Sequence, residues 1–543
     1  MTLFFPARKP LTFPYRLTGQ KSNQISLLGS KFLQRLLLVF SLVITISCNN
    51  QDGRKVILTE KVSLNPSGYA PLSASIILQT KEKVWVRMRV VGQDGPDSDV
   101  VHDFPGLDTN FDIPVHGLYA GNRNTVELTF YDAENTDLNT RTYVINTQPL
   151  LAALPKVTIE KATRSDMAGG MTLVSYYGHD GIPFPQKPFI FDSYGKIRWY
   201  LDYGAHPELK SLFYEDGMER LANGNFFFGS GGEEFGVKPN NRIYEIDLFG
   251  NIVNSWDLPG YGFHHEAFEK PNGNFLVTVN KLGADTIEDY VIEVDRKTNE
   301  ILNEWDLNQS LNNGRKIWTT DGRDWIHANA VLYDETDDTI IVSGRTQGIV
   351  KLTEDNQVVW ILAPHKDWGT AGNGQRLEQF LLTPLDANGQ PITDEAVLQG
   401  DANHPNFEWP WFPHAPMLAP NGELMVFDNG NERNYTGLYD YSRAVSYRIN
   451  VSDLSIRQRW EYGKDRGKET FSRIVGDVDF LEDKGHVLFS PGNVRIPGAY
   501  YGKSIEVDYP SGEVIFEATI TPPMALFDLV TLNRTERLPL YPE

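Results

Sequence analysis

The stretch Pro271-Asn272-Gly273-Asn274-Phe275 decides the fold, because two closely similar stretches occur elsewhere in the chain. They are Ala222-Asn223-Gly224-Asn225-Phe226 and Pro420-Asn421-Gly422-Glu423-Leu424. An Asn-Gly pair between apolar runs is a strong sign of a β-hairpin with a type I′ turn. Recurrence of one hairpin at intervals along a chain indicates a repeat architecture. We therefore expect a repeated, all-β unit.

Each hairpin is followed by two further strand-like runs, for example Ile243-Tyr244-Glu245-Ile246-Asp247 and then a run that carries a tryptophan. Four strands per unit, repeated in tandem, are typical of the blades of a β-propeller. The tryptophan runs contain Trp199, Trp256, Trp305, Trp360 and Trp460. The units begin near Met171, Gly217, His265, His327, His414 and Asp477. The sequence thus predicts a six-bladed β-propeller over residues 156–543.

The part of the chain before the repeats differs from them. Residues 52–150 alternate short strand-like runs with polar turns, which predicts a small antiparallel β-sandwich. The segment from Pro149 to Pro155 is interpreted as a linker. The predicted fold class is therefore all-β throughout, with an N-terminal sandwich before the propeller.

The charge balance restricts the partners. The 71 acidic residues outnumber the 50 lysines and arginines, which gives a net charge of −21. Proteins that bind nucleic acids carry a surplus of basic residues, so no nucleic-acid partner is expected. An anionic substrate would need positive charge concentrated at its own site.

The N-terminal region predicts export. The apolar run 36–48 follows Lys31 and Arg35, is too short to span a bilayer comfortably, and ends in Cys48, the only cysteine. Such a run resembles a bacterial lipoprotein signal, in which the cysteine becomes the lipidated first residue. We expect residues 1–48 to be a signal region and the protein to be exported, either periplasmic or held at a membrane only by lipid on Cys48. An ordinary secretory signal or a short anchor is the alternative.

Three histidines share one position in the repeat. His265 lies six residues before Pro271, and His414 lies six residues before Pro420. His327 opens the corresponding strand of a unit with a longer turn. The first strand of a propeller blade lines the central channel, so the three imidazoles are expected to meet there.

The hairpin register predicts polar partners for these histidines on the neighbouring strands. With each turn centred between Asn and Gly, or on Thr336 in the longer turn, three cross-strand pairs follow, and such neighbours lie about 5 Å apart. The pairs are His265 with Asn280, His414 with Asn429, and His327 with Arg345.

Two more residues belong to the predicted cluster. Asn329 lies two residues beyond His327 and shares its strand face, whereas His264 should point away from its neighbour His265 and ranks second. Imidazoles, amides and one guanidinium on an otherwise acidic protein indicate a site for a tetrahedral anion.

These residues occur in motifs that resemble those of the bacterial arylsulfate sulfotransferases. The motifs are Asp324-Trp325-Ile326-His327-Ala328-Asn329, Ser343-Gly344-Arg345-Thr346-Gln347, His264-His265-Glu266, Pro413-His414-Ala415-Pro416 and Phe427-Asp428-Asn429-Gly430. The resemblance covers most of residues 52–543, including an N-terminal sandwich before a six-bladed propeller. It implies ping-pong transfer of a sulfuryl group from an aryl sulfate to a phenol, without the nucleotide donor PAPS.

The resemblance also assigns roles. His414 matches the histidine that becomes transiently sulfated, and the residues around the transferred group match His265, His327, Asn329 and Arg345. The expected partners are small-molecule phenols and aryl sulfates. No cofactor or metal is expected, and the sequence has no Gly-x-x-x-x-Gly-Lys phosphate loop. Some family members carry a disulfide, which a chain with one cysteine cannot form internally. The oligomeric state is left open between a monomer and a homodimer.

Two other functions remain open at this point. A propeller can be a non-catalytic module that binds an anionic ligand, because fold alone does not give function. The three histidines could also hold the metal of a hydrolase or lyase. Arg345 argues against a cation at that place.

Overall fold

A computed structural model describes residues 56–178, 187–209, 218–229, 241–315, 322–437, 440–496, 499–523 and 530–542. Cys48 and the whole predicted signal region 1–48 lie outside these residues. The described chain is all-β. The only α-helices in these ranges are the short α1 (Leu307–Ser310) and α2 (Glu395–Leu398). Short 3-10 helices span Pro96–Ser98, Tyr203–Ala205, Leu377–Phe380, Arg433–Tyr435 and Lys464–Glu469. None of the described helices has the length and apolar character needed to cross a membrane.

The first five strands form one sheet, in the order β1-β2-β4-β5 with β3 also paired to β2. The strands are β1 (Ile57–Leu64), β2 (Ala74–Val90), β3 (Val100–Val115), β4 (Arg123–Tyr131) and β5 (Asp137–Asn146). The pairing of β2 with β3 is interrupted between Gln79 and Val84, and such irregularities bend a strand. The long strands β2 and β3 therefore pair on both sides of this interruption, and all five strands belong to a single hydrogen-bonded sheet. The two-layered sandwich stays a prediction.

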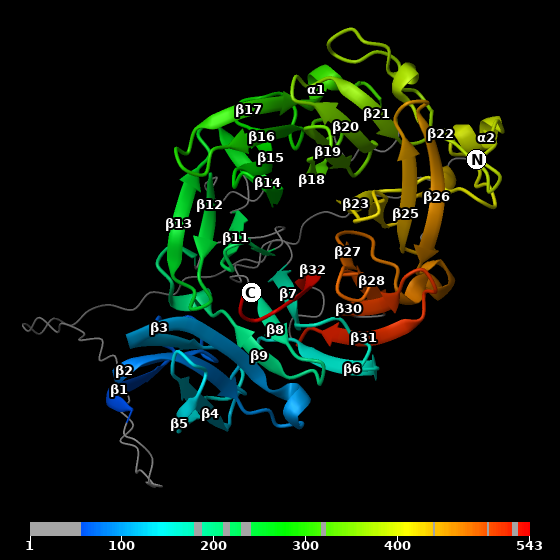
Figure 1. Cartoon of the computed structure of the whole chain (residues 1–543). Helices are drawn as coiled ribbons and strands as arrows, with labels where there is room; N and C mark the ends of the chain where they lie inside the picture. The colour runs from blue at the N-terminus through cyan, green and yellow to red at the C-terminus, as the bar shows by residue number, and fades with distance from the viewer. Residues whose placement is uncertain are drawn as a thin grey trace, which may run out of the picture. The chain divides into compact units, whose positions relative to one another are not determined.

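Six further sheets follow (Figure 1). Three of them contain four consecutive antiparallel strands each. These are β10 (Glu219–Arg220), β11 (Phe226–Gly229), β12 (Arg242–Ile246) and β13 (Ile252–Asp257); β14 (Tyr261–Glu269), β15 (Phe275–Lys281), β16 (Tyr290–Val294) and β17 (Ile301–Asp306); and β18 (Ala328–Asp334), β19 (Thr339–Gly344), β20 (Gly348–Thr353) and β21 (Val358–Leu362). A fourth contains β23 (Pro413–Leu418), β24 (Leu424–Asp428), β25 (Arg443–Asn450) and β26 (Ser455–Tyr462), with β22 (Thr383–Pro384) beside β26.

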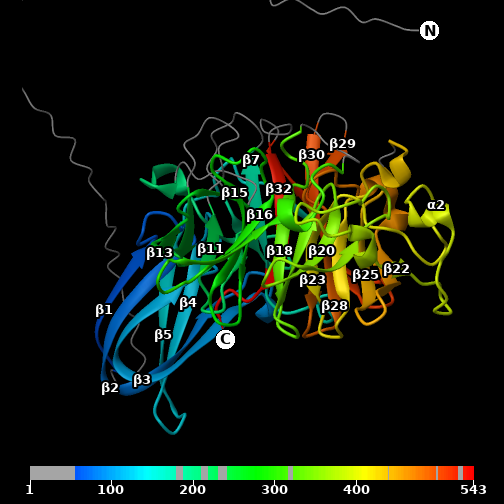
Figure 2. The same ribbon diagram turned by 90° about the horizontal axis from the view of Figure 1, so that it is seen from above.

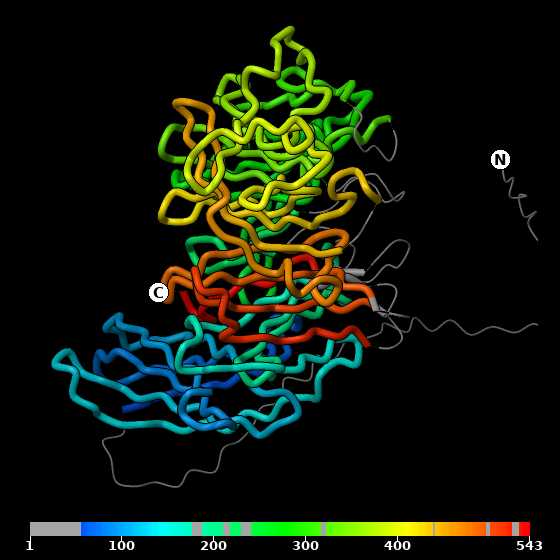
Figure 3. Tube along the Cα trace, turned by 90° about the vertical axis from the view of Figure 1, so that its right-hand side faces the viewer, coloured from blue at the N-terminus to red at the C-terminus, as the bar shows by residue number. Residues whose placement is uncertain are grey.

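The remaining two sheets are completed by strands that are distant in sequence. β32 (Val530–Leu538) pairs with β7 (Met171–Gly178), which continues into β8 (Phe189–Phe191) and β9 (Ile197–Tyr200). β6 (Lys156–Ala162) pairs with β31 (Val514–Thr521) at the edge of the sheet of β27 (Asp477–Leu481), β28 (His486–Ser490) and β30 (Ala499–Asp508), which also holds β29 (Val494–Ile496). Figure 3 shows the red C-terminal trace beside the cyan segment.

This closure corrects one prediction. The unit expected to begin at Met171 has only three strands of its own, and Met171 opens the second strand of its sheet. The C-terminal strand β32 supplies the first strand. The sequence repeat could not show this exchange, because β32 lacks the Asn-Gly turn.

The Asn-Gly hairpins form where they were expected but with a different turn. In the hairpin of β14 and β15, the amide of Gly273 donates to the Lys270 carbonyl oxygen, and the amide of Lys270 donates to that of Asn274. Gly273 has a φ of +87°, whereas Asn272 is not among the residues with positive φ. A type I′ turn needs positive φ at both central residues, so the prediction of that turn was wrong. The observed turn shifts the strand pairing by one residue, to Glu269 opposite Phe275.

The recurring tryptophans join neighbouring sheets. The indole Nε1 of Trp199 donates to the Leu248 carbonyl oxygen at 2.8 Å, and that of Trp305 donates to the Thr353 carbonyl oxygen at 2.8 Å. In each case the acceptor lies in the next sheet along the chain. Trp256 and Trp460 make the same kind of bond, to Arg296 and Pro510. These four tryptophans therefore link each unit to the next one along the chain.

The first strands β14, β18, β23, β27 and β32 contact one another in succession. Figure 2 shows the strands of these sheets standing side by side and running in roughly the same direction. Side chains from several sheets therefore meet along these first strands.

Candidate active site

The first strands enclose a cavity of about 870 Å³. A much smaller cavity adjoins it and is lined by His265, Asn329 and His414. The two cavities share Glu266, Ala415 and Arg534 in their walls. The predicted histidine cluster thus lies at one side of the cavity between the first strands.

A bulge in β14 brings two consecutive histidines into the cluster. The three residues 264–266 lie opposite the single residue Thr278 of β15, and His265 has a φ of +59°. The rings of His264 and His265 have centroids 4.3 Å apart. The prediction that His264 points away from His265 was wrong, because a bulge breaks the alternation of side chains along a strand.

The three repeat histidines meet as predicted. Nε2 of His265 lies 3.1 Å from Nε2 of His327, and their ring centroids are 5.1 Å apart. The ring centroids of His265 and His414 are 6.5 Å apart. His265 and His414 are 8% and 7% exposed, so the cluster is shielded from bulk water.

The pairing predicted for His327 is confirmed. The backbone amide of Arg345 donates to the carbonyl oxygen of His327 at 3.0 Å. Asn329 is the residue at which the pairing of β18 with β19 shifts by one position, and it is 5% exposed. Its Nδ2 donates to the Pro413 carbonyl oxygen at 2.9 Å, and its buried Oδ1 has no hydrogen-bond partner within the described ranges. This oxygen is an acceptor, so a hydrogen-bond donor of a bound molecule, such as a hydroxyl group, could satisfy it.

His414 and Asn429 are in contact although the predicted register was wrong. His414 is paired with Phe427 in the ladder, yet its Nδ1 lies 2.6 Å from Oδ1 of Asn429. Nδ2 of Asn429 donates to the carbonyl oxygens of Ser472 and Val475, both at 2.8 Å. These two bonds fix the amide, so its oxygen must accept from His414. The neutral imidazole then carries its hydrogen on Nδ1 and its lone pair on Nε2.

The surroundings keep His414 neutral. Burial, and after it the charge of Arg345, lower the pKa of His414 to about 3, against the opposing effect of Asn429. Burial and the neighbouring histidines also lower the pKa of His265 well below its ordinary value. At neutral pH both rings are therefore unprotonated bases, and Nε2 of His414 is available as a nucleophile.

Asn280 does not face His265. It pairs with Gly262 in the ladder, and its Oδ1 accepts from the backbone amide of Glu288 at 2.6 Å. The predicted pairing with His265 is therefore wrong, for two reasons: the turn shifts the register by one residue, and the bulge at 264–266 shifts it again. Asn280 instead fixes the backbone of the residue two positions before β16.

That residue, Glu288, was missed by the sequence analysis. Its Oε2 lies 3.1 Å from Nε2 of His264 and contacts Nδ1 of His327, which also lies 3.1 Å from Oδ2 of Asp324. Burial opposes protonation of His327, but Glu288 and Asp324 outweigh it and raise its pKa to about 10. Glu288 lies outside the repeated positions, and the only signal was the acidic pair Glu288-Asp289 just before a strand.

Several of these side chains lie close enough together to hold a metal ion. Ligand atoms of His264, His265 and His327 lie within 4.8 Å of one another, as do those of Glu288, Asp324 and His327. However, Nδ1 of His327 is already in contact with Glu288 and Asp324, and its Nε2 lies 3.1 Å from Nε2 of His265. The cation of Arg345 also acts on both His327 and His414. The arrangement therefore suits an anion better than a metal ion.

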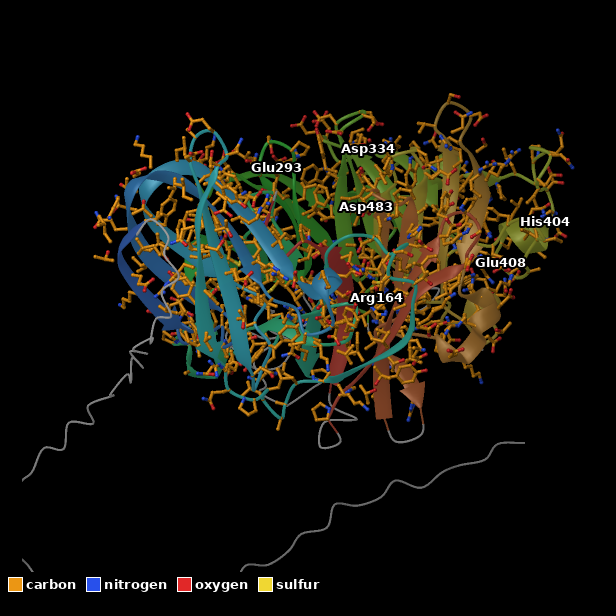
Figure 4. The ribbon with its side chains drawn as sticks, turned by 60° about the horizontal axis from the view of Figure 1, so that its bottom comes forward. Arg164, Glu293, Asp334, His404, Glu408 and Asp483 are labelled. Atoms are coloured by element: carbon orange, nitrogen blue, oxygen red, sulfur yellow. The ribbon has the colours of Figure 1, made fainter. Side chains whose placement is uncertain are left out.

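The large cavity differs in charge from the histidine cluster beside it. Acidic side chains dominate its wall, among them Glu266, Asp477 and, at the end of β18, Asp334 (labelled in Figure 4). Burial raises the pKa of Asp477 to about 6. The guanidinium of Arg534 stands between the two cavities, 2.7 Å from Oε2 of Glu266. The wall of the large cavity thus holds more carboxyl groups than cations, whereas the cation of Arg345 acts directly on the histidine cluster.

Comparison with known proteins points to one family. Residues 156–525, about two thirds of the chain, match the family model described as arylsulfotransferase (ASST), and residues 61–148 match one described as arylsulfotransferase Ig-like domain. The arylsulfate sulfotransferases AssT of Escherichia coli O6:H1 and of Lelliottia amnigena are each 27% identical to this chain, over 84% of it and 90% of their own length. A solved structure of a protein of unknown function from Bacteroides caccae covers 68% of this chain and 98% of its own, at 13% identity and a TM-score of 0.38. That TM-score is too low to bear on fold or function.

Proposed function

The chain belongs to the arylsulfotransferase family, and from this premise we propose that it moves a sulfuryl group from an aryl sulfate to a phenolic acceptor. The observation that carries the proposal is the contact between His414 and Asn429, because it leaves the lone pair of a neutral imidazole on Nε2. The transfer is a ping-pong reaction with a sulfohistidine intermediate on His414.

In the first half-reaction, Nε2 of His414 attacks the sulfur of the aryl sulfate. An N–S bond forms, the S–O(aryl) bond breaks, and the aryl oxygen leaves with the bonding electron pair and one proton from the cluster. The ring of His414 becomes positively charged as the bond forms. The amide oxygen of Asn429, 2.6 Å from Nδ1, stabilises that charge through the Nδ1–H bond.

In the second half-reaction, the oxygen of an acceptor phenol attacks the same sulfur. The N–S bond breaks, and its electron pair returns to Nε2 of His414. The phenol proton passes to a base of the cluster, and the protein returns to its starting state. Because the aryl sulfate is itself the donor, the reaction needs no nucleotide such as PAPS.

The other predicted residues bind the transferred group. Negative charge is spread over the three sulfuryl oxygens in a loose transition state, as in phosphoryl transfer. The guanidinium of Arg345 and the imidazolium of His327 supply positive charge, and Asn329 lines the small cavity beside His414. Prearranged donors in a water-excluded site stabilise such charge strongly. The donor approaches from the Arg345 side, because the wall of the large cavity is acidic.

We propose that the six sheets after residue 156 are the six blades of a propeller. The order of the sheets, the succession of contacts between first strands and the tryptophan bonds between neighbouring sheets support this architecture. In it β32 and β6 close the ring.

We also propose that the protein is exported and acylated on Cys48. The basic residues before the apolar run 36–48, and the cysteine at its end, support this proposal. Lipid on Cys48 would be the only membrane contact.

The function is tested by mixing the purified protein with 4-nitrophenyl sulfate, with and without phenol, and following the release of 4-nitrophenolate. Release that rises with phenol concentration, together with formation of phenyl sulfate, is expected. Release that does not depend on phenol would indicate a hydrolase. Absence of release with a series of aryl sulfates would favour a binding module and contradict the proposal.

A further inference from the structure

Glu288 is held in an uncommon backbone conformation at the edge of the histidine cluster. It has a φ of +60°, in the left-handed region, and it is 2% exposed. Its backbone is fixed on both sides: its amide donates to Oδ1 of Asn280, and its carbonyl oxygen accepts from the amide of Ala328 at 2.8 Å. Non-glycine residues in this conformation cluster at functional sites, where the surrounding structure holds them.

One carboxylate oxygen of Glu288 contacts two histidines. Its Oε2 contacts Nδ1 of His327 and lies 3.1 Å from Nε2 of His264. Nε2 of His327 then points to Nε2 of His265, 3.1 Å away. A chain of three groups thus runs from a buried carboxylate, through His327, to the histidine that lines the small cavity with His414.

We propose that Glu288 is a positioning residue that keeps His327 as an imidazolium, so that His327 and His265 together deliver the proton to the departing aryl oxygen. This inference rests on the proposed sulfuryl transfer and adds to it the source of that proton. Glu288 itself touches neither substrate nor the transferred group.

The protons lost and gained by the protein over the two half-reactions are equal. When the S–O(aryl) bond breaks, the aryl oxygen takes the electron pair and one proton and leaves as the phenol. The pair of His327 and His265 falls from one positive charge to none, and Glu288 keeps its negative charge. In the second half-reaction the pair takes up the proton of the acceptor phenol.

Several charged and titratable groups lie near this pair. His264 and His265 come from β14, Asp324 from the segment before β18, Arg345 follows β19, and His414 lies on β23. Arg345 lowers the pKa of His327, whereas Glu288 and Asp324 raise it to about 10 against the effect of burial. Burial alone would raise the pKa of Glu288, but His264 and His327 hold it well below its ordinary value. Glu288 is therefore ionised wherever His327 is protonated near neutral pH.

The test compares the protein with Glu288→Gln, which keeps the shape of the side chain and removes its charge. The matched control is Glu293→Gln. Glu293 (labelled in Figure 4) is also buried and pairs with Lys270 at 2.9 Å. It lies at the other end of β16 from Glu288. Two readouts are used: nitrogen-15 NMR of labelled histidines, which reports the protonation of His327 directly, and the rate of transfer from two donors.

In the wild-type protein and the control, His327 should carry protons on both nitrogens throughout the neutral range. In Glu288→Gln it should lose one of them at a pH at least one unit lower. For phenyl sulfate, whose leaving group needs a proton, kcat/KM should fall about 100-fold. For 4-nitrophenyl sulfate, which leaves as a stable anion, the fall should be about tenfold or less.

Three results would overturn the inference: a His327 with an ordinary pKa in the wild-type protein, an unchanged titration of His327 in Glu288→Gln, or equal losses for both donors. The wild-type titration decides the matter if Glu288→Gln does not fold. Failure of the proposed function is a separate result, namely a wild-type protein that transfers no sulfuryl group while its His327 titration still depends on Glu288.

Discussion

Oδ1 of Asn429 lies 2.6 Å from Nδ1 of His414, and both hydrogens of the Asn429 amide nitrogen are engaged by backbone carbonyl oxygens. The amide can present only its oxygen to the imidazole. One side chain thus selects the tautomer in which Nε2 of His414 holds the lone pair, and fixes the ring in place.

Replacing Asn429 should therefore impair the chemical step more than binding of the donor. Asn429→Leu removes the acceptor for Nδ1–H, so the ring can rotate or take the other tautomer. We expect kcat for 4-nitrophenyl sulfate to fall on the order of 100-fold, with little change in the donor Kd. Steady-state kinetics with a donor-binding titration checks this. A fall in donor affinity with unchanged kcat would contradict the role given to Asn429.

The pH dependence should show a broad plateau. His414 acts as a neutral base with a pKa of about 3, so the rate falls when the pH drops through that value and the ring is protonated. His327 acts as an acid with a pKa of about 10, so the rate falls when the pH rises through that value and the proton is lost. The measurement is kcat/KM for phenyl sulfate between these limits, with circular dichroism to separate titration from unfolding. A rate that falls on both sides of pH 7, with no plateau in between, would contradict both assignments.

The positive charge of Arg345, held in a fixed place, should be needed for a high rate of sulfuryl transfer. Arg345→Gln removes the charge that stabilises the sulfuryl oxygens, and we expect kcat/KM to fall about 100-fold to 1,000-fold. Arg242→Gln, which breaks an exposed pair with Asp257, is the matched control and should keep full activity. Comparable activities for the two variants would exclude a role of Arg345 in transfer.

Cys48 should determine the attachment to the membrane. Cys48→Ser removes the acceptor for the lipid, so the protein should no longer partition into the membrane fraction or incorporate labelled fatty acid. The transfer activity of the released protein should be unchanged, because every residue of the candidate active site lies after residue 263 in the sequence. Retention of the variant in the membrane fraction would favour a transmembrane anchor instead.

The repeat in the sequence predicted the meeting of the histidines, because residues at one repeat position project towards one place. It also predicted the pairing of His327 with Arg345, although the count across the longer turn was off by one residue, because the register shift at Asn329 compensates for that error. The class of fold followed from the same Asn-Gly turns and recurring tryptophans. These features depend on local patterns that each unit repeats.

What the sequence could not predict lies in departures from the repeat. The bulge at 264–266 brings His264 inward and moves Asn280 away from His265. The local composition of a bulge does not differ from that of a regular strand. In addition, a hairpin turn that differs from the predicted type shifts the pairs of that hairpin by one residue. Glu288 escaped notice for a related reason: it joins the cluster through a left-handed backbone that Asn280 and Ala328 fix from other strands.

The central claim is that the sulfuryl group passes through Nε2 of His414. The most direct measurement is mass spectrometry of the protein after reaction with 4-nitrophenyl sulfate in the absence of any phenol, followed by digestion. The account predicts a gain of one SO₃ group on the peptide that contains His414, a matching burst of 4-nitrophenolate, and loss of both in His414→Asn. Phenol-dependent turnover that continues in His414→Asn, or a sulfuryl group found on another residue, would contradict it.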